Sequence, residues 1–289
     1  MTIPGRDMTP ARVLLLTALA MAAFAANSLL CRVALRDTTI DAVTFTSVRL
    51  IAGALTLWLI VGLRSGKPGV AGSWHSALAL FAYAITFSWA YQSLSAAAGA
   101  LLLFGAVQAT MIAYGLWAGE RLRGRQWIGL LLALGGLVGM MLPGLSAPPL
   151  SGALSMMTAG MAWGVYSLRG KGGGDPASAT AGNFLRTLPM TLALSLALLG
   201  DARWDLAGVW YAVGSGAVAS GIGYAIWFAA LPGLKATSAA TVQLSVPVIA
   251  AVGAILFLGE SLTLRLVLAS ITILGGIALV ILGQKAGPR

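Results

Sequence analysis

The chain alternates between long apolar runs and short polar connections, and this pattern continues along its whole length. The runs have the length of about 20 residues that a helix needs to cross the hydrocarbon core of a membrane. They lack the strict alternation of polar and apolar positions that is typical of a half-buried strand, so we interpret them as helices. The pattern predicts ten membrane spans, over residues 11–32, 41–63, 74–94, 97–118, 124–142, 151–169, 179–199, 206–229, 237–258 and 262–283.

Part of the first half of the chain returns in the second half after a shift of 140 residues. In each copy an apolar run ends in a Gly-Glu pair, and the next apolar run contains a Gly-Gly pair. An ungapped comparison over the 24 positions of residues 119–142 gives eight identities. A segment that faces lipid is not expected to repeat a polar pair by chance. The two Gly-Glu pairs, Gly119-Glu120 and Gly259-Glu260, therefore indicate an internal repeat.

The repeat determines how the two halves are oriented relative to each other. Ten spans divide into two units of five, over residues 1–147 and 148–289. Because five is odd, the second unit must enter the membrane in the opposite direction. Inverted repeats are an architecture of secondary transporters, whose substrate sites lie near the midplane between the halves. We predict an all-α integral membrane protein with two inverted five-helix repeats around a central cavity.

Composition and charge agree with a membrane protein. Of the 289 residues, 58% are hydrophobic and 9% are charged, which exceeds the apolar content that a soluble domain can bury. The net charge of +10 does not indicate a nucleic-acid partner, because the cations are scattered over short loops. Cytoplasmic loops carry an excess of Lys and Arg. If the termini are cytoplasmic, the inner segments hold twelve cations and the outer segments four. We therefore predict that both termini are cytoplasmic.

Residues for enzyme chemistry are scarce. With one histidine, one cysteine and no pair of carboxylates inside a span, the sequence offers no metal cluster, thiol dyad or acid-base pair. The GxxxxGK[ST] motif of nucleotide-binding loops does not occur. We therefore predict no catalytic residue, no metal and no cofactor, and we do not expect an enzyme.

Polar residues inside the spans are candidates for solute binding, because such residues tend to face a cavity or the interior of a helix bundle. Asn27, Gln108 and Gln243 are amides of this kind, although hydrogen bonds between helices explain them equally well. Arg49 and Arg186 each lie about eight residues into a span. Either arginine is predicted to attract a substrate carboxylate or to hold helix carbonyl groups near one membrane face.

Glu120 and Glu260 lie at span boundaries. Each is predicted to pair with a nearby arginine (Arg121, Arg125 or Arg265) and fix a helix end, or to take part in gating. Every other carboxylate also lies in a loop or at a boundary. We therefore expect no proton carrier at the midplane, where proton-driven transporters commonly have one.

Aromatic and small residues also form helical patterns. Tyr83, Trp163 and Tyr224 each begin a short aromatic stripe at helical spacing, which is more often packing or lipid-facing surface than a binding site. Small residues four apart predict close helix contacts. These pairs are Gly135 with Gly139 in the fifth span and Gly216 with Ser220 in the eighth. The fifth and tenth spans, almost without polar residues, are expected to be scaffold or a subunit contact.

Taken together, these features resemble the EamA-type branch of the drug/metabolite transporter superfamily. The shared features are ten spans as five plus five, an arginine early in the second span of each half, the Gly-Glu pairs that close the fourth spans, and glycine-containing fifth spans. Within the superfamily the chain looks most similar to bacterial exporters of aromatic amino acids. One position departs from the pattern, because Pro247 in the ninth span has Val107 as its shifted counterpart. This argues against a symmetric hinge.

The resemblance implies that the third, sixth and eighth spans surround the cavity. Deep aromatic residues lie in those spans, and rings that line a pocket suit an apolar or aromatic solute. The expected substrate-binding residues are therefore Asn27, Tyr83, Gln108, Trp163, Tyr224, Trp227 and Gln243.

The leading interpretation is a secondary transporter in a bacterial inner membrane. It is expected to export small metabolites, in particular aromatic and other apolar amino acids, by alternating access down the solute's own gradient. The alternatives are an exporter of hydrophobic drugs or purine-type metabolites, a membrane enzyme, and a partner subunit that transports nothing itself. The expected partners are the solute and the lipid bilayer. The sequence is compatible with a homo-oligomer, but a monomer suffices for transport.

Overall fold

The computed structural model describes residues 9–65, 71–119, 121–144, 147–170, 175–234, 239 and 242–283. Within these ranges the chain is helical and has no strand. Ten helices are described, and one of them consists of three segments with different winding. The helices are α1 (Pro10–Asp37), α2 (Ala42–Ser65), α3 (Trp74–Tyr91), α4 (Ala96–Trp117), α5 (Gly124–Met141), α6 (Leu150–Arg169), α7 (Pro176–Ala197), the continuous α8 (Leu206–Val213), η2 (Gly214–Ile222) and α9 (Gly223–Ala230), α11 (Ser245–Leu258) and α12 (Leu264–Gly283).

The predicted all-helical membrane fold with ten helices is confirmed. By length and composition alone, six of the described helices are apolar and long enough to cross a membrane. These are α1, α2, α4, α5, α12 and the continuous helix that begins with α8. The ninth predicted span begins at residue 237, but part of its start lies outside the described residues, and α11 begins at Ser245. The bounds of the other helices differ from the predicted spans by a few residues, the largest difference being the extension of α1 to Asp37.

Side chains that bind free backbone N–H groups begin several of these helices. Ser73 and Ser95 accept hydrogen bonds from the first turns of α3 and α4, and Asp175 and Asp205 do the same for α7 and α8. Such N-caps satisfy donors that a helix start leaves without partners. At the other end of α11, Gly259 adopts a left-handed conformation with φ 64°. This allows the chain to turn sharply before Glu260.

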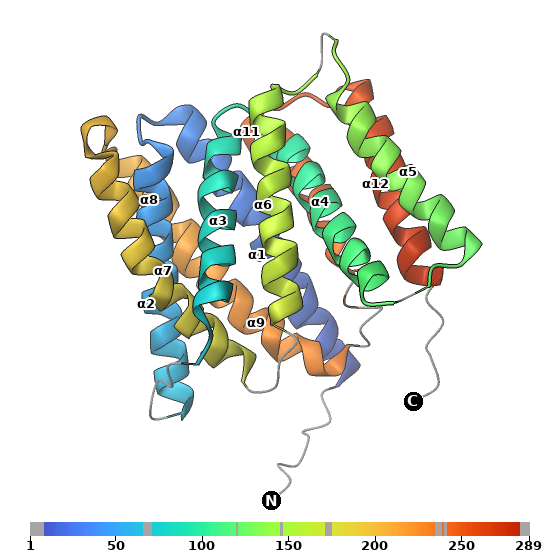
Figure 1. The fold of residues 1–289 in the computed structure, drawn as a ribbon. Coiled ribbons are helices and arrows are strands. Elements are labelled where there is room, and N and C mark those ends of the chain that lie inside the picture. Colours follow the sequence, from blue (N-terminus) through green and yellow to red (C-terminus); the bar gives the residue numbers. More distant parts are fainter. Residues whose placement is uncertain are drawn as a thin grey trace, which may run out of the picture.

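The two halves interlock instead of lying as separate domains. Helix α1 packs against α9 and α11 of the second half, and α6 packs against α3 and α4 of the first half in the same way. The pairs α2 with α7, α4 with α11 and α5 with α12 each join equivalent helices. Figure 1 shows that α1 and α6 run in opposite directions, as inverted repeats require. Helix α1 begins and α12 ends at the same end of the bundle, which we call the terminal face (Figure 1).

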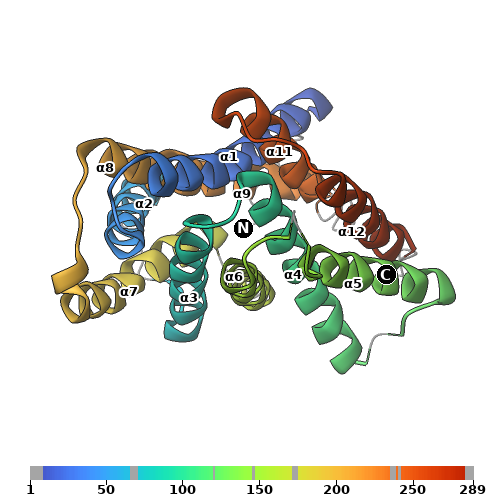
Figure 2. The ribbon, with the colours of Figure 1, turned by 90° about the horizontal axis from the view of Figure 1, so that it is seen from above.

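Helices α5 and α12 form a separate pair at one edge of the molecule (Figures 1 and 2). Gly129 and Gly276 approach each other across this pair, and Gly136 lies against Ile273. The predicted small-residue face of Gly135 and Gly139 is wrong for the described part of the chain, where no atom outside the local helix backbone lies within 4 Å of a Cβ placed at either residue. Helix α5 instead packs against α12 through the face that carries Gly129 and Gly136. The two roles expected for these spans, a scaffold or a subunit contact, stay predictions.

The segment η2 is a π-helix in the middle of the eighth helix. Its small residues bring the backbone close to α2, since a Cβ on Gly216 would overlap the carbonyl oxygen of Arg49. The predicted small-residue face at Gly216 therefore exists as a contact with α2. Wide turns of this kind occur mostly at functional sites. Ser215 of this segment binds Asn27 of α1, and Ala219 and Ser220 line the pocket described below.

Candidate substrate site

A pocket lies where helices from both halves meet. Its empty space amounts to about 440 Å³, part of which is open to the surroundings. The residues that line it come from α1, α3 and α4 of the first half and from α6, η2, α9 and the position of Gln243 just before α11 in the second half. They are Phe24, Asn27, Ser28, Tyr83, Phe87, Leu103, Phe104, Trp163, Ala219, Ser220, Tyr224 and Gln243. None of these described residues carries a charge.

One wall of the pocket is aromatic. The ring of Trp163 is stacked on Tyr224, with centroids 5.4 Å apart and an interplanar angle of 17°. Trp163 also lies 4.9 Å from the ring of Tyr83 on α3, and Phe24 on α1 lies 5.6 Å from the ring of Tyr224. Three of the predicted stripes therefore meet, although they come from different helices. Rings packed in this way present flat apolar faces to a solute.

Another part of the pocket is polar, and Tyr83 belongs to both parts, with its ring in the aromatic wall and its hydroxyl among the polar groups. Ser215 on η2 donates a hydrogen bond of 2.6 Å to the carbonyl oxygen of the Asn27 amide. The amide nitrogen of Asn27 donates to the hydroxyl of Tyr83 at 3.2 Å. The guanidinium of Arg49 donates to the same hydroxyl, also at 3.2 Å. A chain of hydrogen bonds thus connects the second half of the protein with α1, α3 and α2.

Arg49 is buried behind this polar part, with 2% of its surface exposed. Its guanidinium carbon lies 5.3 Å from the ring centre of Tyr83 and 4.9 Å from that of Phe87, so both rings provide cation–π contacts. Its Nε and Nη1 atoms have no hydrogen-bond partner, and no carboxylate pairs with it in the described part of the chain. Within the described residues, Arg49 is therefore a buried positive charge next to the pocket without a carboxylate partner.

Five of the seven predicted binding residues line the pocket. Gln108 and Trp227 do not, although both are buried. Trp227 lies behind the aromatic wall, where it contacts Phe24 edge-on at 6.1 Å. Gln108 occupies α4 five residues after Leu103, which is the residue that reaches the pocket from that helix together with Phe104. The five residues brought together are Asn27, Tyr83, Trp163, Tyr224 and Gln243.

Arg186 differs from Arg49 in its surroundings. Its Nη1 donates to the carbonyl oxygens of Ala71 at 2.7 Å and Gly182 at 2.9 Å. Arg186 therefore holds the segment before α3 against α7. This is the second of the two roles predicted for the arginines, and no pocket residue contacts Arg186 through these bonds.

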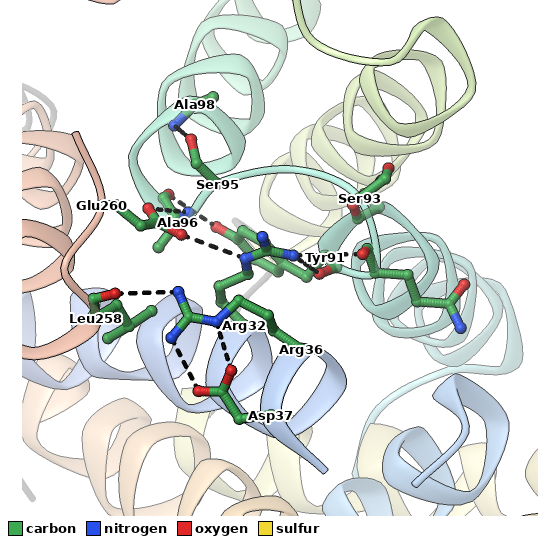
Figure 3. A network of polar contacts seen from close by, with 12 residues as sticks. Arg32, Arg36, Asp37, Tyr91, Ser93, Ser95, Ala96, Ala98, Leu258 and Glu260 are labelled. Carbon is green, nitrogen blue, oxygen red and sulfur yellow. Dashed lines mark hydrogen bonds and ion pairs between the residues drawn. The ribbon is translucent and has the colours of Figure 1, made fainter. Parts of the chain in front are cut away.

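Glu260 joins three helices through polar contacts (Figure 3). It precedes the start of α12, which lies at the end of the bundle opposite the terminal face (Figure 1). One carboxylate oxygen pairs with Nε of Arg32 on α1 at 3.3 Å, and the other accepts the backbone N–H of Ala96 at the start of α4 at 2.8 Å. Arg32 also donates to the carbonyl of Tyr91 at 2.9 Å. The predicted partner Arg265 is wrong, because it donates instead to the carbonyls of Leu142 and Pro143. Glu120 lies outside the described residues.

Sequence reasoning missed seven of the lining residues. Leu103 is the counterpart of Gln243 after the shift of 140, so the repeat itself carried a signal for it. Phe87 was identified only as part of the stripe that begins at Tyr83, and Ser220 only as part of the small-residue face with Gly216. The others lie among apolar or small neighbours of similar type, which hides them in the pattern. They are Phe24, Ser28, Phe104 and Ala219.

Comparison with known proteins agrees with this architecture. A model of the EamA-like transporter family matches residues 11–142 and again residues 150–282. A Pseudomonas aeruginosa protein described as "Uncharacterized protein PA1977" is 58% identical over 283 residues, which cover 96% of this chain and 99% of that protein. A solved structure described as "Crystal structure of protein" is similar in fold, with a TM-score of 0.66, 19% sequence identity, and coverage of 95% of this chain and 98% of its own. With two consecutive matches that cover both halves, the chain belongs to the EamA-like transporter family of membrane proteins.

Proposed function

We propose that the protein is a secondary transporter that exports small metabolites, in particular aromatic and other apolar amino acids, across a bacterial inner membrane. The observation that carries this proposal is the pocket between the two repeats, with its aromatic wall and its polar part. A flat apolar body fits the rings of Trp163 and Tyr224, and the backbone atoms of an amino acid fit the hydrogen-bonding groups of Asn27 and Tyr83. Orientation by a few placed polar groups is typical of small-molecule pockets.

Alternating access is the mechanism that the symmetry of the helix contacts favours. Helix α1 contacts α9 and α11 as α6 contacts α3 and α4, and this symmetry supports an exchange of conformations between the two halves. In one conformation the pocket opens toward the terminal face, and in the other it opens toward the opposite face. The contacts of Glu260 with Arg32 and Ala96 close α1, α4 and α11 together at the opposite face. Opening that face requires these contacts to break.

The solute's own gradient drives this export. All carboxylates in the described ranges lie at helix ends or in connections, and none lies halfway along a helix. In liposomes, counterflow should therefore proceed without a proton gradient. A proton gradient imposed on equal solute concentrations should cause no accumulation. Uphill accumulation that a protonophore abolishes would show that transport is coupled to protons.

The main experiment is reconstitution of the purified protein into liposomes with labelled phenylalanine, leucine, adenine and a cationic dye. Phenylalanine should show counterflow. Trp163→Ala should reduce its rate about tenfold, because stacking contributes about 1 kcal/mol beyond burial and the pocket also loses apolar contact. Trp89→Ala is the matched control, since Trp89 lies on α3, does not line the pocket and is 40% exposed. Counterflow of the dye or adenine in place of the amino acids would favour the alternative exporters, and no flux of any solute would favour a partner subunit.

The orientation of the chain is also a proposal and has its own test. The excess of cations on the segments at the terminal face supports cytoplasmic termini. A cysteine introduced at Ala147 should react with a membrane-impermeant thiol reagent from outside the cell, and one at Gly172 should react only from the cytoplasm. The reverse pattern would invert the topology.

A further inference from the structure

We propose that the pocket binds its solute through a carboxylate, which accepts a hydrogen bond from Tyr83 and is stabilised by the charge of Arg49. This inference rests on the proposed transport function and specifies the solute's chemistry. It states that a carboxylate is required and that an amino group is not.

The hydrogen bonds of Tyr83 leave one donor for a ligand. A phenol has one hydrogen to donate and accepts through its oxygen. The oxygen of Tyr83 already accepts from Asn27 and Arg49, each at 3.2 Å. Its own hydrogen finds no acceptor in the described part of the chain, and Tyr83 lines the pocket. The hydroxyl therefore presents a donor to the pocket, polarised by the neighbouring guanidinium.

Asn27 adds a second donor at the same place. Its amide oxygen is occupied by the hydroxyl of Ser215, so the amide nitrogen carries the two remaining hydrogens. One of them binds Tyr83. Asn27 also lines the pocket, so its other hydrogen is available to a solute. The free hydrogens of Tyr83 and Asn27 are adjacent, and the oxygens of both side chains already accept hydrogen bonds. Such a site suits a carboxylate, which accepts hydrogen bonds, better than an ammonium group, which donates them.

The positive charge of Arg49 means that this site favours a negatively charged group. Arginine stays protonated in proteins, and burying a charge without a partner costs several kcal/mol. The two ion pairs in the described ranges, Arg32 with Glu260 and Arg36 with Asp37, involve neither Arg49 nor a pocket residue. A carboxylate that accepts a hydrogen bond from Tyr83 is separated from the guanidinium of Arg49 only by the hydroxyl of Tyr83, and it supplies the missing negative charge. Arg49 does not line the pocket, so it acts on the solute through Tyr83 as a positioning residue.

The same features disfavour cations. No described lining residue is acidic, so an ammonium group finds no countercharge in the pocket. One face each of Tyr83 and Phe87, which otherwise attracts cations, is already used by Arg49. A solute with an aromatic ring and a carboxylate satisfies both parts of the pocket.

Four probes with the same phenyl group separate the contributions of carboxylate and amine. These are phenylalanine, 3-phenylpropanoate, phenylalaninamide and 2-phenylethylamine, each titrated into the purified protein by calorimetry. The two carboxylates should bind, and the amide and the amine should bind at least about tenfold more weakly, as expected for a hydrogen bond to a charged group. Equal binding of the amide or amine, or no binding of 3-phenylpropanoate, would overturn the inference.

Variants then test the assigned residues through the ratio of 3-phenylpropanoate affinity to phenylalaninamide affinity. Tyr83→Phe keeps the ring and removes the hydroxyl, and it should lower this ratio about tenfold. Arg49→Gln should lower it at least as much, and Arg49→Lys should restore part of it. Arg186→Gln is the matched control and should leave the ratio unchanged. If Arg49→Gln does not fold, Tyr83→Phe decides, and an unchanged ratio in Tyr83→Phe contradicts the inference.

Transport measurements distinguish this inference from the proposed function. If 3-phenylpropanoate binds with the expected selectivity but no labelled solute crosses the liposome membrane, the function fails and the carboxylate site stands. If labelled phenylalanine crosses but the amide competes as well as the acid, the function stands and the inference fails.

Discussion

Arg49 and Arg186 occupy similar places in the two repeats, early in the second helix of each half, but their surroundings differ. Arg49 is 2% exposed, has one hydrogen-bond acceptor and lies against two aromatic rings. Arg186 is half-buried and donates to two backbone carbonyls, one of them outside its own helix. The same position in a repeat therefore serves a pocket in one half and a helix connection in the other. Duplication preserves the fold, while the neighbours of each copy decide its role.

The largest expected effect comes from replacing each arginine with a methionine of similar length. Arg49→Met should lower transport at least about tenfold without lowering stability, because removing a buried charge that has no countercharge is neutral or stabilising. Arg186→Met should lower stability by about 1–3 kcal/mol, because two carbonyls lose a charged donor, and should leave the transport rate of the folded protein unchanged. Flux in liposomes and thermal unfolding in detergent measure the two effects. If Arg49→Met lowered only stability and Arg186→Met lowered only transport, the roles assigned to the two arginines would be exchanged.

A third arginine extends the comparison to the opposite face. Arg32 pairs with Glu260 and donates to the carbonyls of Tyr91 and Gln92, so it resembles Arg186 and not Arg49. Arg32→Met should therefore lower stability by about 1–3 kcal/mol. It should also increase the fraction of molecules that are open at that face. Thermal unfolding and the reactivity of a cysteine introduced at Ser28, compared with the same cysteine in the wild-type background, measure both. An unchanged reactivity would show that the contact between Glu260 and Arg32 does not keep that face closed.

Two glycines support the two arginine environments and allow a smaller test. A Cβ on Gly216 would overlap the carbonyl oxygen of Arg49, and a Cβ on Gly182 would overlap that of Ala71. Overpacking typically costs about 1–3 kcal/mol, so both Gly216→Ala and Gly182→Ala should lower the melting temperature. Only Gly216→Ala should also raise the solute concentration needed for half-maximal flux. A similar flux change in both variants would mean that the two sites are not independent.

The smallest expected difference concerns the two amides in equivalent helices. Gln243 lines the pocket and Gln108 does not. Gln243→Leu should change phenylalanine flux a few-fold, as expected for the loss of about 1 kcal/mol of hydrogen bonding. Gln108→Leu should change flux by less than twofold. A larger effect of Gln108→Leu would extend the pocket along α4.

The sequence allowed the fold to be predicted in more detail than the site, for physical reasons. Spans and repeats depend on local composition, so the helices were found with bounds that differ by a few residues. Helix α4 is apolar on nearly all sides, and such a helix does not reveal which face meets the cavity. This explains why Gln108 was misplaced and why Phe104 was missed. The partner of Glu260 lies 228 residues away in the chain, and local spacing favoured Arg265 instead.

The winding of the eighth helix was also beyond prediction. The residues of η2 are small and apolar, and the same composition occurs in ordinary α-helices. Their wide turn coincides with the close contact between Gly216 and α2, which is a tertiary interaction that local composition does not reveal. The positions of Ser215, Ala219 and Ser220 follow from that contact. The polar part of the pocket therefore required the structure, whereas the aromatic wall was partly visible as stripes.

The absence of acidic side chains among the described lining residues has a consequence for the membrane voltage. With no titrating carboxylate there, the charge that moves with the solute is the solute's own. A zwitterionic amino acid then crosses without moving net charge, and its export does not respond to voltage. An aromatic monocarboxylate carries one negative charge, and a potential of about 100 mV, negative inside, favours its exit by ~2.3 kcal/mol. One carrier would thus equilibrate amino acids at equal concentrations, whereas aromatic acids, which move down their own electrochemical gradient, would reach an outside concentration about fiftyfold above the inside one.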